Sequence, residues 1–165
     1  MKNVFVLLSL AGCLLASAAA RASAIEVRVV DGGGKPLADV VLYAQAQAGV
    51  PQPPPKPVQG AQIEQRGQKF VPLVSVVQAG ALVQFPNYDK VRHHIYSFSP
   101  AKKFDQKLYS GVAAAPQVFE RAGTVVLGCN IHDRMLAYVK VVDTPWFAKT
   151  DEAGIARLAL PAAGN

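Results

Sequence analysis

The feature that most constrains this fold is a succession of short β-rich runs that fills the chain from Lys69 to Asp143. β-Branched, aromatic and leucine residues dominate each run, and Gly, Pro or Asn punctuates the gaps between them. The runs are, in order, KFVPLVSVV, ALVQFPN, HHIYSFS, PQVFE, GTVVLGC and LAYVKVVD. No helical periodicity accompanies them, so the sequence predicts an all-β domain, either an antiparallel sandwich or a barrel.

Residues 1–24 have the pattern of a secretory signal peptide. Lys2 provides a basic start, an apolar run extends from Val4 to Ala16, and a small-residue Ala-x-Ala cleavage site ends at Ala24. The run is shorter than the ~20 residues that a membrane-spanning helix needs. We therefore expect a mature protein that begins near Ile25 and is periplasmic or otherwise exported, without a membrane span.

Cys13 offers a second interpretation of this leader. Leu-Ala-Gly-Cys at 10–13 resembles a bacterial lipoprotein processing site, at which the cysteine becomes a lipid-modified N-terminus. The residues after Cys13 stay apolar instead of forming a polar tether, which favours cleavage near Ala24. In both cases Cys129 is left as the last unmodified cysteine of an exported chain, so a disulfide framework is excluded.

We divide the mature chain into a domain at 25–145 and a tail at 146–165. IEVRVVD and ADVVLYAQA, on either side of a GGGKP turn, predict a hairpin or a sandwich corner. Five prolines between 48 and 60 predict an extended loop at 47–60. The tail has a turn at 151–154 between two possible strands, and we expect a hairpin that lacks its return strand, in a chain that is truncated or naturally short.

GCNIHDRM, residues 128–135, places Cys129, His132 and Met135 three residues apart. A mononuclear copper electron-transfer site requires a thiolate, two imidazoles and a weak axial thioether. One tight loop can supply three of these ligands, and HHIYSFS upstream offers His93 or His94 as the fourth. Cys and Met are also common core residues, and single histidines are often structural. Half a zinc site fits less well, because no second Cys or Cys/His pair with finger spacing is present in the sequence.

VVQAGALVQFPNYDKVRHHIYSFS followed by AGTVVLGCNIHDRMLAYVKVVD resembles the cupredoxins, the plastocyanin and amicyanin family of small blue-copper proteins. The short Cys-x-x-His-x-x-Met loop is most similar to that of amicyanin. Over nearly its whole mature length the chain also resembles bacterial plastocyanin-like proteins often labelled methylamine utilisation proteins. This resemblance implies a Greek-key β-sandwich that binds one type 1 copper ion.

The resemblance also implies the ligands, with His93, Cys129 and His132 in the trigonal plane and Met135 axial. Arg92-His93-His94-Ile95 aligns best with His93 as the ligand, and His94 then stands where the family has an Asn that ties the two ligand loops together. His94 is expected to lie at the surface or beside the site without a metal bond. Ile131 stands where the nearest relatives have Pro, so it keeps an amide N–H. A hydrogen bond from that amide to the thiolate would raise the reduction potential.

The implied function is outer-sphere electron transfer by a monomeric carrier that is not an enzyme. If the methylamine resemblance extends to function, the donor is a periplasmic amine dehydrogenase and the acceptor a c-type cytochrome. A copper carrier or buffer would use the same ligands, although the mature chain has no further Met/His cluster. An interaction module without a redox role is suggested by IEVRVVDGGGKPLADVVLYA and KTDEAGIARLALP, which resemble pieces of the carboxypeptidase regulatory-like sandwich.

Charged and aromatic residues near these motifs have less specific interpretations. Without Lys2 and Arg21, the 17 basic residues become 15 against 11 acidic ones, and the resulting formal charge of +4 is no signature of nucleic-acid binding. Asp89 and Asp133 lie near the ligand segments, but no paired carboxylates or Ser/His/Asp group predicts hydrolysis. Four aromatic residues are expected in the core, namely Phe70, Phe85, Phe98 and Trp146. A docking rim for an acidic redox partner is a candidate role for six basic residues, although charge clusters are usually solvated: Lys90, Arg92, Lys102, Lys103, Lys107 and Arg134.

Overall fold

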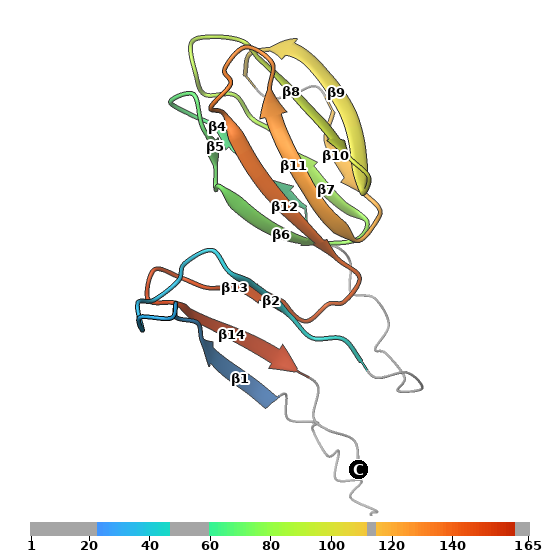
Figure 1. The fold of residues 1–165 in the computed structure, drawn as a ribbon. Helices are drawn as coiled ribbons and strands as arrows, with labels where there is room; N and C mark the ends of the chain where they lie inside the picture. The colour runs from blue at the N-terminus through green and yellow to red at the C-terminus, as the bar shows by residue number, and fades with distance from the viewer. Residues whose placement is uncertain (1–22, 47–59, 112–114, 161–165) are drawn as a thin grey trace, which may run out of the picture.

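The computed structural model describes residues 23–46, 60–111 and 115–160, and every regular element in these ranges is a β-strand (Figure 1). The predicted all-β class is therefore confirmed. Cys13 and most of the Pro-rich loop lie outside the described residues. Within the described ranges, no helix is long and apolar enough to cross a bilayer.

The larger layer is a five-stranded sheet. Its order is β6 (Val74–Gln78), β12 (Leu136–Val142), β11 (Gly123–Cys129), β8 (His93–Ser99) and β9 (Lys102–Tyr109). The β6–β12 pair is parallel and the other pairs are antiparallel. Alternation decides which side chains face inward, so Val125, Leu127 and Cys129 of β11 are buried while Val126 is exposed.

A second layer covers one face of this sheet. It contains β10 (Gln117–Phe119), β7 (Ala81–Gln84) and β3 (Ala61–Gln62), and a short hairpin of β4 (Glu64–Gln65) and β5 (Phe70–Val71) continues from it. The chain passes between the two layers after β6, β7, β9 and β10. These crossings make a Greek-key sandwich, the predicted fold class.

Apolar side chains from both layers fill the space between them. Phe85, Phe119 and Ile95 are fully buried, and the Phe104 ring stacks on Phe85 with ring centroids 5.9 Å apart. Burying one such side chain contributes about 1.5–3 kcal/mol. Phe70 and Phe85 are core residues as predicted, but the prediction for Phe98 is wrong, because 77% of it is exposed. Phe98 occupies an outward position of β8, where His93, Ile95 and Ser97 take the inward ones.

The two ends of the chain form a smaller unit together. β1 (Ser23–Arg28) pairs with β14 (Ile155–Leu160), and β2 (Val41–Tyr43) pairs with β13 (Phe147–Lys149). The first two runs therefore do not pair with each other as a hairpin, which was one of the two predicted arrangements, and β14 pairs with β1. Residues of 23–46 and 147–160 are therefore paired with each other through these strands, while the domain at 25–145 and the tail at 146–165 stay a prediction. A period-two pattern identifies a strand but does not name the strand that pairs with it.

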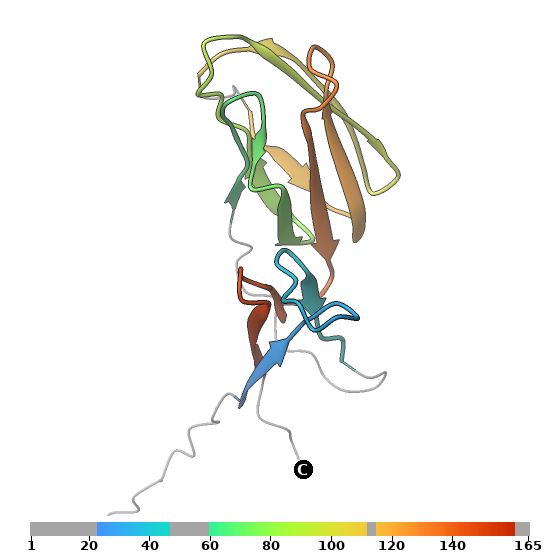
Figure 2. The same cartoon turned by 60° about the vertical axis from the view of Figure 1, so that its left-hand side comes forward.

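The smaller unit lies beyond one end of the sandwich in both views (Figures 1 and 2). Lys149 joins the two units, because its Nζ donates to the Val74 carbonyl at 2.9 Å and pairs with Asp39 at 2.5 Å. The loop between β11 and β12 lies at the opposite end of the sandwich (Figure 1). This leaves the loop that carries the predicted copper ligands uncovered by the smaller unit.

Candidate metal centre

Three of the predicted ligand side chains converge at the free end of the sandwich. One ligand atom each from His93, Cys129 and His132 lies within 4.8 Å of the others. The Cys129 Sγ is 3.7 Å from the His93 Nδ1 and 3.9 Å from the His132 Nδ1. The two imidazole centroids are 5.1 Å apart. In both rings it is Nδ1 that faces the Cys129 sulfur.

Strand geometry explains how His93 and Cys129 meet. Cys129 is the last residue of β11 and pairs with Ile95, while His93 is the first residue of β8. Residues His93, Ile95 and Cys129 all point into the sandwich, so the two ligands share one face. The Asn130 amide donates to the His94 carbonyl at 3.1 Å and closes the ladder beside the site.

His94 lies on the other side of the strand. Its ring contacts the Asp105 carboxylate of β9, away from Cys129. A register irregularity between His93 and Ile95 falls at this residue, where a bulge re-aims side chains. Of the neighbouring histidines, His93 is the one placed beside the sulfur. The backbone bond from Asn130 to His94 joins the two ligand segments at the place where the resemblance leads us to expect an Asn side chain.

The loop from Cys129 to Met135 folds back on itself. The Met135 amide donates to the His132 carbonyl at 2.9 Å, and Met135 is buried in the same core cluster as Cys129. His132 is half-buried, whereas Ile131 is 47% exposed. One imidazole edge of the cluster therefore lies near solvent, while the sulfur and the other ring lie deep.

Asp89 is a member of the site to which the sequence assigned no role. Its Oδ2 is 2.8 Å from the His93 Nε2, and it also accepts bonds from the amides of Gly67 at 2.6 Å and Gln68 at 2.9 Å. Burial raises the pKa of Asp89, but the bonds from Gln68, His93 and Gly67 outweigh burial and lower the pKa below its ordinary value of 3.8. The carboxylate is therefore ionised and faces the ring from the side opposite Cys129. Its place four residues before His93 was the available sequence signal.

Asn87 and Tyr109 make hydrogen bonds that hold the chain segment around Asp89. The Asn87 side-chain amide donates to the carbonyls of Val91 and Tyr109, each at 2.9 Å, and its oxygen accepts from the Asp89 amide at 2.9 Å. The Tyr109 hydroxyl donates to the Phe85 carbonyl at 2.5 Å. Burial raises the pKa of Tyr109 well above its ordinary value of 10.0, so this donor keeps its proton.

The donor set and its spacing fit a transition metal. Bonds of about 2.0 Å to nitrogen and about 2.3 Å to sulfur, at an angle of about 120°, would separate the two atoms by about 3.7 Å. The separations of 3.7 and 3.9 Å agree with a trigonal arrangement. A thiolate, two imidazoles and a thioether are the ligand types that copper electron-transfer sites use. Cys129 is free of any disulfide, and only 3% of it is exposed.

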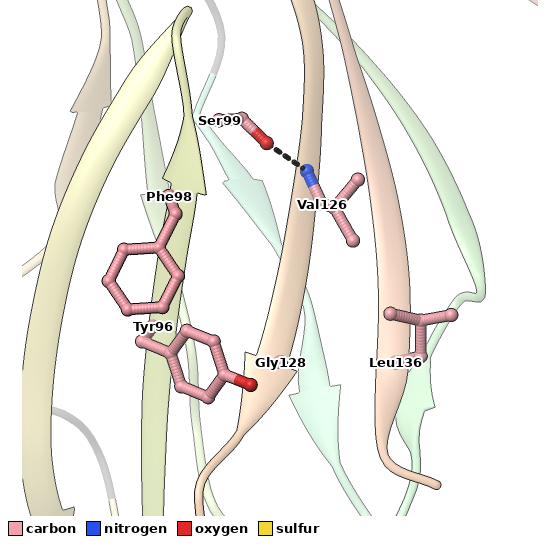
Figure 3. Close-up of a pocket in the computed structure, with 6 residues that line it drawn as sticks. All are labelled: Tyr96, Phe98, Ser99, Val126, Gly128 and Leu136. Carbon is pink, nitrogen blue, oxygen red and sulfur yellow. Dashed lines mark hydrogen bonds between the residues drawn. The ribbon is translucent and has the colours of Figure 1, made fainter. Parts of the chain in front are cut away.

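The outer face of the sheet carries an aromatic patch directly behind Cys129. Figure 3 shows the Tyr96 ring against Gly128, with Phe98 beside it, in a shallow pocket of about 300 Å³. A Cβ at Gly128 would lie 2.7 Å from the Tyr96 Cζ, so glycine is what allows this close approach. The ring therefore covers the backbone next to the candidate ligand without entering the site.

Comparisons with known proteins found similarity to solved structures. No protein-family model and no curated protein matches the chain. A reduced Cu(I) form of an amicyanin variant is similar at 19% identity over 50% of this chain and 82% of that chain, with a TM-score of 0.46. A novel purple cupredoxin from Nitrosopumilus maritimus is similar at 26% identity over 50% of this chain and 99% of that chain, with a TM-score of 0.45.

Proposed function

We propose that this protein is a type 1 copper protein that carries single electrons between redox partners in the periplasm. The observation that carries the proposal is the convergence of the His93 and His132 Nδ1 atoms on the Cys129 Sγ, with His93 and Cys129 buried and His132 half-buried. When bound, copper would supply the one-electron couple that these side chains lack. Met135, which is buried in the same core cluster as Cys129, would be the candidate fourth ligand.

The protein itself contributes rigidity and access. His93 and Cys129 lie on paired strands, so their separation is set by the sheet and not by a loop. A site held in this way needs little rearrangement when its charge changes, which favours fast electron transfer. His132 is half-buried between the exposed residues Ile131 and Asp133, and its ring edge offers the shortest route to a partner.

Exposed residues at the metal end support a proposed docking surface. Three apolar side chains at the metal end are exposed by 43–53%, namely Tyr88, Val91 and Ile131. Lys90, Arg92 and Arg134 are exposed among them. We propose that an acidic protein with an apolar centre docks here, with an amine dehydrogenase as donor and a c-type cytochrome as acceptor. Because the Debye length is about 10 Å at 0.1 M salt, the electron-transfer rate with such a partner should fall as ionic strength rises.

Adding Cu(II) to the purified mature protein tests the copper proposal. We expect an intense visible thiolate-to-copper band that Cys129→Ser abolishes. The two neighbouring histidines give a matched pair, since His93→Ala should abolish the band and His94→Ala should leave it. A protein that stays colourless and binds no copper would contradict the proposal, as would equal effects of the two histidine variants.

A second measurement separates electron transfer from copper delivery. We expect the protein to pass through repeated cycles of reduction by ascorbate and oxidation by ferricyanide with its copper retained in the presence of a competing chelator. A copper carrier or buffer would lose the ion to the chelator.

The smaller unit supports a second candidate function. The two segments that resemble carboxypeptidase regulatory-like pieces pair with one another at the end remote from the candidate copper site. An interaction module of this kind would keep its fold and its partner binding in Cys129→Ser, whereas a redox role would be lost.

A further inference from the structure

His93 can bind a metal through Nδ1 only when that nitrogen carries no proton. A neutral imidazole holds one proton, on Nδ1 or on Nε2, and the hydrogen bond at one nitrogen decides the state of the other. The His93 ring is fully buried, so its protein neighbours and not solvent decide which nitrogen carries the proton. Its Nδ1 faces the Cys129 Sγ at 3.7 Å, and its Nε2 faces the Asp89 Oδ2 at 2.8 Å.

Asp89 can act only as an acceptor in this arrangement. Its Oδ1 accepts from the Gly67 amide, and its Oδ2 accepts from the Gln68 amide as well as facing Nε2. Both amides donate and neither can accept, so an ionised carboxylate satisfies all three groups. The proton of the His93 ring is therefore held on Nε2.

The β4–β5 hairpin fixes Asp89 in turn. Gly67 and Gln68 form its tip with φ values of 61° and 57°, which turn their two amides toward the carboxylate. Two backbone bonds tie the hairpin to the segment before the ligand, from Gln65 to Pro86 at 2.8 Å and from Tyr88 to Gln65 at 2.9 Å. The orientation of His93 thus depends on a hairpin that contributes no ligand.

We infer that Asp89 is the positioning residue of the site, and that the β4–β5 hairpin holds its carboxylate so that His93 presents a free Nδ1 to the metal. The inference rests on the proposed copper function. A carboxylate that accepts the Nε2 hydrogen bond also makes Nδ1 a stronger electron donor to a bound metal. This favours Cu(II) over Cu(I) and lowers the reduction potential. In this chain the hairpin tip at 67–68, which lies 21–22 residues before Asp89, would therefore tune a bound metal without providing a ligand.

The first test needs no metal. Ring ¹⁵N chemical shifts of the metal-free protein, recorded at a pH where an ordinary histidine is neutral, report which His93 nitrogen holds the proton. We expect the Nε2–H form in the wild type and a mixture of both forms in Asp89→Asn, because an amide cannot accept all three bonds. Asp89→Glu, which keeps the charge, should restore the Nε2–H form. Asp133→Asn is the matched control, since it makes the same change at an exposed carboxylate beside His132.

The second test measures binding and potential. Removing a partner of a metal-bound histidine usually costs about 10- to 100-fold in metal affinity. We expect this loss for Co(II) and Cu(II) in Asp89→Asn, together with a reduction potential higher than that of Asp133→Asn. Unchanged ring shifts, or an affinity within twofold of the Asp133→Asn protein, would overturn the inference. The ring shifts are read without copper, so they judge the role of Asp89 even if the wild type forms no blue site, and circular dichroism verifies that each variant is folded.

Discussion

Gly154→Ala is expected to destabilise the smaller unit and to spare the metal site. Gly154 has a φ of 72°, a conformation that costs an L-residue about 1–2 kcal/mol. A Cβ there would also lie 2.4 Å from the Val29 carbonyl oxygen, so the backbone must move. The movement disrupts the bonds from Val29 to Gly154 at 2.8 Å and from Leu37 to Val29 at 3.0 Å, each worth about 1 kcal/mol. The total loss is about 3–4 kcal/mol.

Gly34→Ala is the control that isolates the clash. Gly34 lies in the same unit with a φ of 83°, but nothing lies within 4 Å of its added Cβ. Its expected cost is the backbone term alone, about 1–2 kcal/mol. The difference between the two variants therefore measures the steric contact with Val29.

The assay uses two probes of denaturant unfolding. Trp146 is the one tryptophan of the sequence and lies next to β13, so its fluorescence reports the smaller unit. The visible copper band reports the sandwich, because the candidate ligands lie there. Gly154→Ala should lower the fluorescence midpoint and leave the midpoint of the sandwich in place. Equal costs of the two glycine variants would refute the steric argument, and coincident midpoints by both probes would refute the division into two units.

Three further predictions follow from the core and the site. Leu127→Ala, at a fully buried position two residues before Cys129, should lower the free energy of unfolding of the sandwich by about 2–5 kcal/mol, and a loss below 1 kcal/mol in urea titrations would contradict this. Ile131→Pro removes the amide two residues after Cys129 and should lower the reduction potential, so an unchanged or higher value in voltammetry would count against a role for that amide. The folded state keeps Tyr109 protonated, so stability should fall as pH rises above 10, by up to about 1.4 kcal/mol per pH unit, and Tyr109→Phe should remove that part of the slope.

The local sequence pattern was sufficient to predict the candidate metal ligands that lie close together in sequence. Cys129, His132 and Met135 share one loop, so their spacing alone showed that they could meet. Alternation along HHIYSFS limited the choice between His93 and His94, because neighbouring strand residues point to opposite faces. The placement of His93 beside the sulfur follows that rule.

The sequence pattern could not predict contacts between residues that lie far apart in the chain. Asp89 was noticed for its closeness to the ligand segments, yet its bonds to Gly67 and Gln68 depend on a hairpin more than 20 residues away. Phe98 was expected in the core because it is aromatic, whereas its parity on β8 places it outside. For Asp89 and Phe98 the sequence specified the type of side chain, but it did not specify which residues surround that side chain in space.

The sequence by itself determined that the chain is all-β and that one loop offers a thiolate, an imidazole and a thioether, because strand period and loop spacing are local properties. Only the tertiary structure decided which strands pair. It joined β1 to β14 and β2 to β13 across more than 100 residues, and it brought the β4–β5 hairpin against Asp89. The physical reason is that a strand exposes the same backbone donors and acceptors to every possible partner, so the partner is selected by packing of the whole chain.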